Sequence, residues 1–264
     1  MAKSQEYSKE EIKPEGRPLS EPLPRAILMD LDDTILAFSE GMAPCWRQIC
    51  ERFAPRLAGP TAEELFAAIQ DSRTRFWSDA ERARRGRLDI NQARREIIAA
   101  ALRQLNVDAP ALVEEIAEVY GREREKTIHP LPGAIEALRA LRDRGVRLGL
   151  ITNGPAVMQR SKVERFGLAP LFEAIVIEGE FGAGKPDPRV YRHALERLEV
   201  APAEAWMVGD HLEIDVAAAQ SLGMVGVWMD HAGQGLPEDS PIRPDGIIRS
   251  LAELIEWGNA SASF

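Results

Sequence analysis

The sequence has little cysteine and no apolar segment long enough to cross a bilayer. Its two cysteines, Cys45 and Cys50, lie five residues apart in a chain of 264. This spacing matches no zinc pattern and does not place both thiols on one helix face. We therefore expect reduced thiols and a cytoplasmic protein. No apolar run approaches the roughly 20 residues of a membrane-spanning helix, and the polar N-terminal segment has no apolar signal core.

Positive charge is also scarce, because 33 Lys and Arg stand against 42 Asp and Glu and give a net charge of −9. A nucleic-acid binder normally carries a basic balance or a basic stripe, so we expect neither a nucleic-acid nor a membrane partner. Apolar residues make up 45% of the chain and charged residues 28%, which is ordinary for a globular protein. The length suits one large domain, or one domain with a sizeable insertion.

Short apolar runs recur along the chain and predict strands. Continuous runs of this kind are typical of strands that are buried on both faces. Helical patterns fill most gaps between them, and one of these begins at Asp187-Pro188, an N-cap residue followed by proline. Strands that alternate with helices predict right-handed crossovers and a parallel, Rossmann-like α/β sheet. The five runs cover residues 26–29, 146–151, 174–177, 206–208 and 225–229.

One long stretch breaks this alternation and predicts only helices. Thr61 and Glu64 form a capping-box pattern, Asp89 with Gln92 forms a similar start of a second helix, and Asp108 caps a third that has Pro110 in its first turn. We therefore expect an all-helical subdomain inserted after the first strand. The predicted division is a polar, disordered tail (1–24), an α/β core (25–36 and 127–257), the inserted helical subdomain (37–126) and a C-terminal tail (258–264).

Polar residues follow several of the predicted strands. Ligands of open α/β sheets bind beyond the carboxyl ends of the strands, so the topology should bring these residues to one rim. They are Asp30 and Asp32 after the first run, Thr152 and Asn153 after the second, Lys185 after the third and Asp210 after the fourth.

The chemistry of these residues is coherent. Several carboxylates at one rim repel each other, so a hard cation is expected, and oxygen ligands suit Mg²⁺. A lysine, a hydroxyl and an amide beside that cation suit a phosphoryl group. A carboxylate can itself act as the nucleophile and form an aspartyl phosphate. A second carboxylate two residues further on can protonate the leaving oxygen and then activate water.

Four segments of the chain resemble the motifs of the haloacid dehalogenase (HAD) superfamily, and the resemblance covers about residues 25–257. Their combination at four predicted strand ends is specific, although each alone is weak. The segments are Asp30-Leu31-Asp32-Asp33-Thr34, Thr152-Asn153, Lys185-Pro186-Asp187-Pro188 with Tyr191, and Gly209-Asp210-His211-Leu212-Glu213-Ile214-Asp215.

The resemblance implies a fold and a set of roles. The sheet would have the order 3-2-1-4-5 in the numbering of the apolar runs, and the inserted helices would form the cap that closes over the substrate. The implied roles are nucleophile and Mg²⁺ ligand for Asp30, general acid/base and Mg²⁺ ligand through its carbonyl for Asp32, third Mg²⁺ ligand for Asp210, support for Asp215, and phosphoryl binding for Thr152, Asn153 and Lys185.

Within this family, Asp32 favours phosphate chemistry, because the dehalogenases lack an acid at that position. Phosphonate-hydrolysing relatives use a cap lysine, and there is no lysine between Ala37 and Glu125. We therefore expect a phosphatase that hydrolyses a small phosphorylated metabolite. A sugar phosphomutase with the same core, or a non-catalytic binding protein on this fold, remain alternatives. The substrate, the oligomeric state and the role of His211 stay open.

The predicted cap is rich in arginine, and two interpretations of this cluster compete. The residues could hold an anion over the active site, or they could form a solvated face beside an aromatic core. The second interpretation is favoured for most of them, although one arginine could still reach the substrate. The cluster consists of Arg73, Arg75, Arg82, Arg84, Arg85 and Arg87, with Phe76 and Trp77 nearby.

Overall fold

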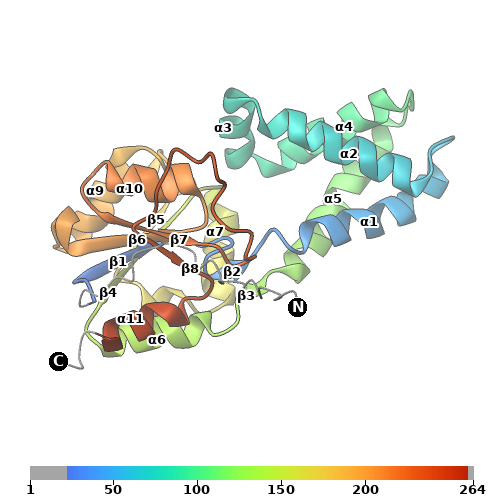
Figure 1. Cartoon of the computed structure of the whole chain (residues 1–264). Coiled ribbons are helices and arrows are strands. Elements are labelled where there is room, and N and C mark those ends of the chain that lie inside the picture. Colours follow the sequence, from blue (N-terminus) through green and yellow to red (C-terminus); the bar gives the residue numbers. More distant parts are fainter. Residues whose placement is uncertain (1–22, 261–264) are drawn as a thin grey trace, which may run out of the picture.

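The apolar runs form the strands of a parallel sheet. The structure, a computed structural model, describes residues 23–260. Its main sheet has the order β5-β4-β1-β6-β7-β8, and every neighbouring pair is parallel (Figure 1). The strands are β1 (Ala26–Met29), β4 (Arg147–Thr152), β5 (Ala174–Ile177), β6 (Ala205–Gly209), β7 (Val225–Met229) and β8 (Gly246–Ile248).

The predicted order of the first five strands is confirmed, but the prediction missed a sixth. The edge strand β8 pairs with β7 through Gly246, Ile247 and Ile248 only. A run of three residues that begins with glycine carries too little apolar periodicity to be recognised from the sequence.

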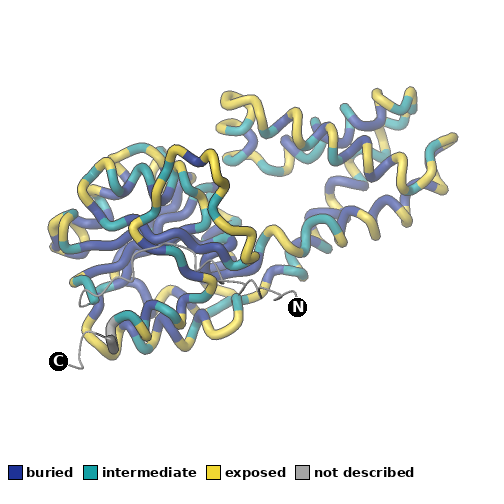
Figure 2. The backbone as a smooth tube through the Cα atoms, in the orientation of Figure 1, coloured by how far each residue is buried: buried dark blue, intermediate teal, exposed yellow. Residues whose placement is uncertain are grey.

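Helices cover both faces of this sheet because the strand side chains alternate. In β1, Ile27 and Met29 face one apolar cluster, while Ala26 and Leu28 face another. The first face is covered by α6 (Ala134–Asp143), α7 (Ala156–Arg165) and α11 (Ala252–Ala260), and the second by α9 (Pro188–Arg197) and α10 (Ala218–Gln220). The sheet therefore forms the buried middle layer of the core (Figure 2). A short helix, α8 (Glu178–Phe181), follows β5.

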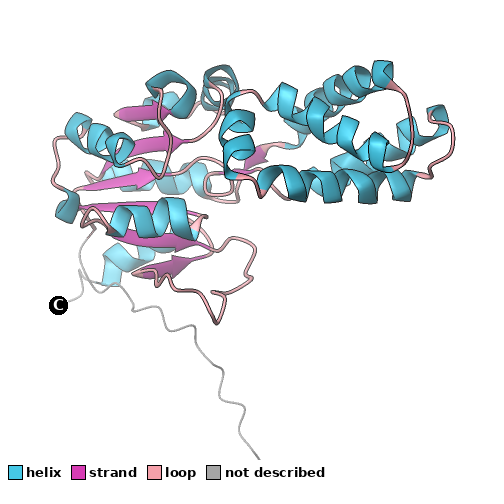
Figure 3. Cartoon of the chain, turned by 90° about the horizontal axis from the view of Figure 1, so that it is seen from above, coloured by secondary structure: helices cyan, strands magenta, loops and turns pink. Residues whose placement is uncertain are grey.

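The inserted segment folds into a separate helical layer beside the core (Figure 3). Its helices pack around an apolar cluster that includes Trp46, Phe53, Leu65 and Ile98. The chain enters and leaves this cap through β2 (Leu36–Ala37) and β3 (His129–Pro130), which pair antiparallel. The helices are α1 (Met42–Phe53), α2 (Ala62–Trp77), α3 (Ala80–Leu88), α4 (Ile90–Gln104) and α5 (Pro110–Thr127).

Two of the three predicted N-caps of the inserted helices are present. The Thr61–Glu64 capping box is present at the start of α2. The Asp89 side chain accepts a hydrogen bond from the backbone N–H of Gln92 at the start of α4. The prediction for Asp108 was wrong: Ala109 occupies the N-cap position of α5, with no side-chain hydrogen bond to the helix. Proline in the first turn already supplies the fixed φ that begins a helix.

The predicted tails only partly coincide with the residues that lie outside the described range 23–260. The predicted N-terminal tail falls on residues 1–22, outside the described residues, except for Leu23 and Pro24. Leu23 packs against the core cluster. At the other end, α11 continues to Ala260, past the predicted end of the core. Within residues 23–260, no helix combines the length and apolarity needed to cross a membrane.

Candidate active site

The register of the sheet brings the predicted residues to one rim. Met29 lies opposite Leu150 of β4 and Val208 of β6. The residue after Met29, Asp30, therefore stands one position short of Thr152 on one side and Asp210 on the other. This follows from parallel pairing alone, since equal steps along parallel strands end at the same edge.

Lys185 lies buried between two carboxylates of this rim. Its Nζ donates to Oδ1 of Asp30 and to Oδ1 of Asp215, each over 2.5 Å. The side chains of Lys185 and Asp215 are each only 1% exposed. Burial disfavours the charged ammonium, but the carboxylates of Asp215 and Asp30 outweigh it and raise the pKa of Lys185. Lys185 therefore carries a fixed positive charge against the candidate nucleophile.

The turn after β6 explains why Asp215 reaches this lysine. Leu212–Ala217 form a π-helical turn, a feature that is frequent at functional sites. The backbone N–H of His211 donates to Oδ2 of Asp215 over 3.0 Å. A side chain at Gly209 would collide with the Asp215 carboxylate, so glycine is required at that position. Both oxygens of Asp215 thus accept hydrogen bonds, while the His211 ring lies at an exposed position.

Three carboxylates gather where a cation is expected. Oxygens of Asp30, Asp210 and Asp215 all lie within 4.8 Å of one another. Burial, with the charge of Asp215 adding to it and Lys185 opposing it, raises the pKa of Asp30 to about 7. Burial and the charges of Asp30 and Asp215 raise the pKa of Asp210 to about 8. Carboxylates so crowded fit a hard divalent cation, which would compensate their charge.

The Asp32 carboxylate lies outside this cluster and is held by two donors that the sequence prediction missed. Lys162 Nζ donates to both of its oxygens, over 2.8 and 2.7 Å, and Gln159 Nε2 donates to Oδ2 over 3.1 Å. Both donors come from α7 and are buried. The available signal was their spacing, because polar residues at i and i+3 occupy the helix face that should be apolar.

The remaining predicted residues mostly hold the rim together. Thr152 Oγ1 accepts from Gln159 over 2.5 Å. Asn153 exchanges two hydrogen bonds with the backbone of Lys185, over 2.7 and 2.8 Å. Asp33 accepts from the backbone N–H groups of Phe38 and Ser39, which braces the turn after β1. Asn153 therefore fixes the loop that carries the lysine.

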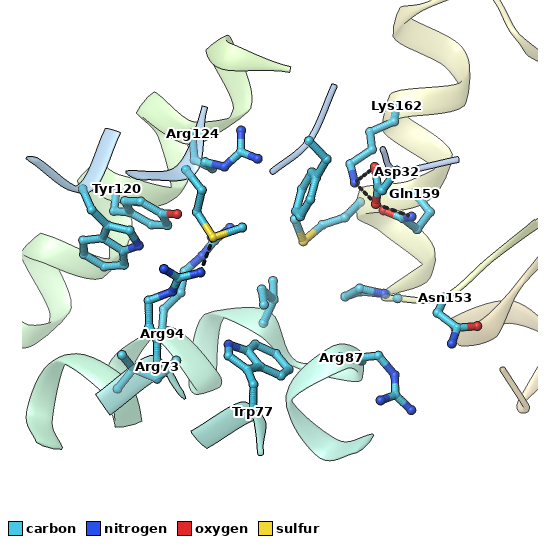
Figure 4. A pocket seen from close by; sticks show the side chains of 18 residues that line it. Asp32, Arg73, Trp77, Arg87, Arg94, Tyr120, Arg124, Asn153, Gln159 and Lys162 are labelled. Atoms are coloured by element: carbon cyan, nitrogen blue, oxygen red, sulfur yellow. Dashed lines mark hydrogen bonds and ion pairs between the residues drawn. The ribbon is translucent and has the colours of Figure 1, made fainter. Parts of the chain in front are cut away.

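A pocket of about 390 Å³ lies between this rim and the cap (Figure 4). Asp32, Gln159 and Lys162 line its core side, while Arg73 and Tyr120 stand across from them. The expected solvated face is present at four positions, because Arg75, Arg82, Arg84 and Arg85 are exposed. Arg73, Arg87 and Trp77 instead line the pocket, Phe76 is buried in the cap, and the sequence prediction missed the pocket residues Arg94 and Arg124.

The fold and this rim define the class of α/β enzymes that bind their ligand beyond the carboxyl ends of a parallel sheet. Comparison with known proteins narrows the class. Residues 24–223 match the haloacid dehalogenase-like hydrolases, so the chain belongs to this family of hydrolases. A phosphoserine phosphatase from Thermus thermophilus is 45% identical over 148 residues, 55% of this chain. That match spans only 57% of the relative's own length.

Two further similarities cover more of the chain. A glyceraldehyde 3-phosphate phosphatase from Methanopyrus kandleri is 32% identical over 206 residues, which are 77% of this chain and 82% of that protein. The magnesium-bound HAD-hydrolase YfnB from Bacillus subtilis superposes with a TM-score of 0.70 over 90% of this chain and 99% of its own, at 23% identity. The relatives from Thermus thermophilus and Methanopyrus kandleri are both phosphatases. The similarity to YfnB shows the shared fold.

Proposed function

We propose that this protein is a Mg²⁺-dependent phosphatase that hydrolyses a small phosphomonoester through a phosphoaspartate on Asp30. The observation that carries the proposal is the buried Asp30 at the end of β1, bonded to Lys185 and grouped with Asp210 and Asp215. The names of the curated relatives, which hydrolyse phosphoserine and glyceraldehyde 3-phosphate, support this reaction class.

The arrangement supports a two-step reaction. An oxygen of Asp30 attacks phosphorus, the bond to the leaving oxygen breaks, and an aspartyl phosphate forms. Asp32 gives a proton to the leaving oxygen, then takes one from the water that hydrolyses the intermediate. Lys185 neutralises charge on the phosphoryl oxygens, and Thr152 and Asn153 line the same rim. Lys162 and Gln159 orient the Asp32 carboxylate toward the pocket.

A divalent cation fits the carboxylates of Asp30 and Asp210, with Asp215 beside them and the Asp32 carbonyl as a further predicted ligand. Both oxygens of Asp215 already accept hydrogen bonds, which favours its predicted supporting role. Mg²⁺ is the proposed ion because the side-chain donors are all oxygen. When bound, it would neutralise charge on the transferring phosphoryl group.

The direct test is phosphate release from an aryl phosphate, with Mg²⁺ or with EDTA. Asp30→Asn should lower kcat by at least about 1000-fold, as expected when a nucleophile is removed. Asp143→Asn is the matched control, since Asp143 lies exposed at the end of α6. When the substrate carries a radiolabelled phosphoryl group, acid-quenched wild-type protein should retain the label. Hydroxylamine should then release this label from the protein. Turnover in EDTA, or full activity of Asp30→Asn, would rule out the mechanism.

A further inference from the structure

The cap side of the pocket carries more positive charge than its neighbours compensate. Five of the 18 lining side chains are cationic, and Asp32 is the only acidic residue among them. Lys162 is paired with Asp32, and Arg87 lies 3.4 Å from Glu178. The other three arginines form no ion pair with any residue of the described range 23–260. They are Arg73 of α2, Arg94 of α4 and Arg124 of α5.

Arg124 is the most constrained of the three. It is only 2% exposed, and its Nη1 donates to Thr127. Its Nε and Nη2 are buried without a hydrogen-bond partner in the part of the chain that the structure describes. These two nitrogens form one edge of the guanidinium, the edge that binds a carboxylate with two parallel hydrogen bonds. A buried charge with an unused donor edge is costly, so a ligand that fills this edge would be strongly favoured.

Arg94 reaches the same region because a glycine makes room for it. A Cβ atom at Gly121 would lie 2.6 Å from Nη1 of Arg94. The Arg94 Cζ also lies 5.5 Å from the centre of the Tyr120 ring, which stacks on Trp46. Burial lowers the pKa of both Arg94 and Arg73, in agreement with their positions inside the pocket.

Phe38 connects this cluster to the rim of the core. Arg124 Cζ lies 4.5 Å from its ring centre, and Lys162 Nζ lies 4.3 Å from the same point. The sum of these two distances, 8.8 Å, is an upper limit on the separation of the two cations. Lys162 is bonded to Asp32. A short organic molecule could therefore reach from Asp32 to the Arg124 edge.

We propose that Arg73, Arg94 and Arg124 form a carboxylate-binding subsite for the end of the substrate remote from the phosphoryl group. This inference rests on the proposed phosphatase function and names its substrate class, a phosphorylated carboxylic acid. The carbon chain between the two anions lies against apolar walls that include Trp46, Trp77 and Ile90. The free donor edge of Arg124, formed by Nε and Nη2, suits a planar carboxylate that accepts two parallel hydrogen bonds.

The test compares phosphorylated ω-hydroxy acids with alkyl phosphates of the same chain length. The carboxylates should have a kcat/KM about 10- to 100-fold higher, the value of a charge-assisted hydrogen-bonded pair. Arg124→Gln should abolish most of this ratio. The matched control is Arg122→Gln, on the same helix, because the Arg122 side chain is 62% exposed. Equal ratios in wild type and Arg124→Gln would overturn the subsite, and so would a stronger preference for alkanediol bisphosphates.

Two further arms keep the test decisive. If Arg124→Gln does not fold, Gly121→Ala should displace Arg94 and lower the same ratio. Calorimetric titration in EDTA measures binding without turnover, and wild type should bind the phosphorylated acid about 10-fold or more tightly than the alkyl phosphate. Absence of turnover on every substrate would contradict the proposed phosphatase, whereas equal binding of the two ligands would contradict the subsite.

Discussion

Removing divalent cations should destabilise this protein more at high pH than at low pH. Burial is the main cause that raises the pKa of Asp30 to about 7 and that of Asp210 to about 8. A carboxyl group whose pKa is higher in the folded than in the unfolded chain binds protons more tightly when folded. Its protonation therefore favours the folded state at low pH, and this contribution is lost as the pH rises from 3.8 toward 8.

The size of the effect follows from the displacement of the pKa. For Asp30 alone, a rise from 3.8 to about 7 corresponds to about 4 kcal/mol, at about 1.4 kcal/mol for each pH unit. Asp30 and Asp210 interact, so their contributions do not add, and we take about 4 kcal/mol as the scale for the pair. A loss of this size is a large fraction of the roughly 5–15 kcal/mol that stabilises a domain.

The assay is urea unfolding at about pH 6 and about pH 9, in EDTA and in excess Mg²⁺. In EDTA, the free energy of unfolding should fall by about 1–3 kcal/mol between the two pH values, because the rest of the loss lies below about pH 6. Mg²⁺ should restore several kcal/mol at the higher pH and much less at the lower one, because protons compete with the cation for the carboxylates. Asp210→Asn should lose most of this Mg²⁺ effect, whereas Asp143→Asn should keep it. Equal stabilisation by Mg²⁺ at both pH values would refute the reasoning.

Three substitutions test the supporting structure. Lys185→Met leaves Asp30 and Asp215 buried without their shared partner, so the free energy of unfolding in urea should fall by about 3–5 kcal/mol, and unchanged stability would contradict this. Gly209→Ala should lower kcat by about 10-fold or more in the phosphate-release assay, because the new methyl group displaces Asp215; wild-type kcat would show that the rim tolerates the shift. Thr61→Ala removes the capping box of α2 and should lower the free energy of unfolding by about 1 kcal/mol, with kcat unchanged.

The rim of the core could be predicted from the sequence because it depends on local patterns. An apolar run identifies each central strand, and parallel pairing then brings the residue after each run to one edge. Asp30 and Asp210 were found in this way without any side-chain geometry. The same reasoning missed β8, whose three residues begin with glycine. It also missed the partners of Asp32, since Lys162 and Gln159 lie on a helix rather than at a strand end.

The cap pocket could not be predicted in the same way, because its residues come from separate helices whose packing no local pattern encodes. Arg75 and Arg73 are two positions apart on α2, yet one is exposed and the other lines the pocket. Arg94 enters the pocket only because Gly121, on another helix, leaves the space that its guanidinium occupies. The core thus presents its reactive groups through strand register, which one substitution in the cap does not alter. The ligand-facing side of the cap depends on pairs such as Arg94 and Gly121, so substitutions there should change which phosphate ester is preferred before they change the reaction at Asp30.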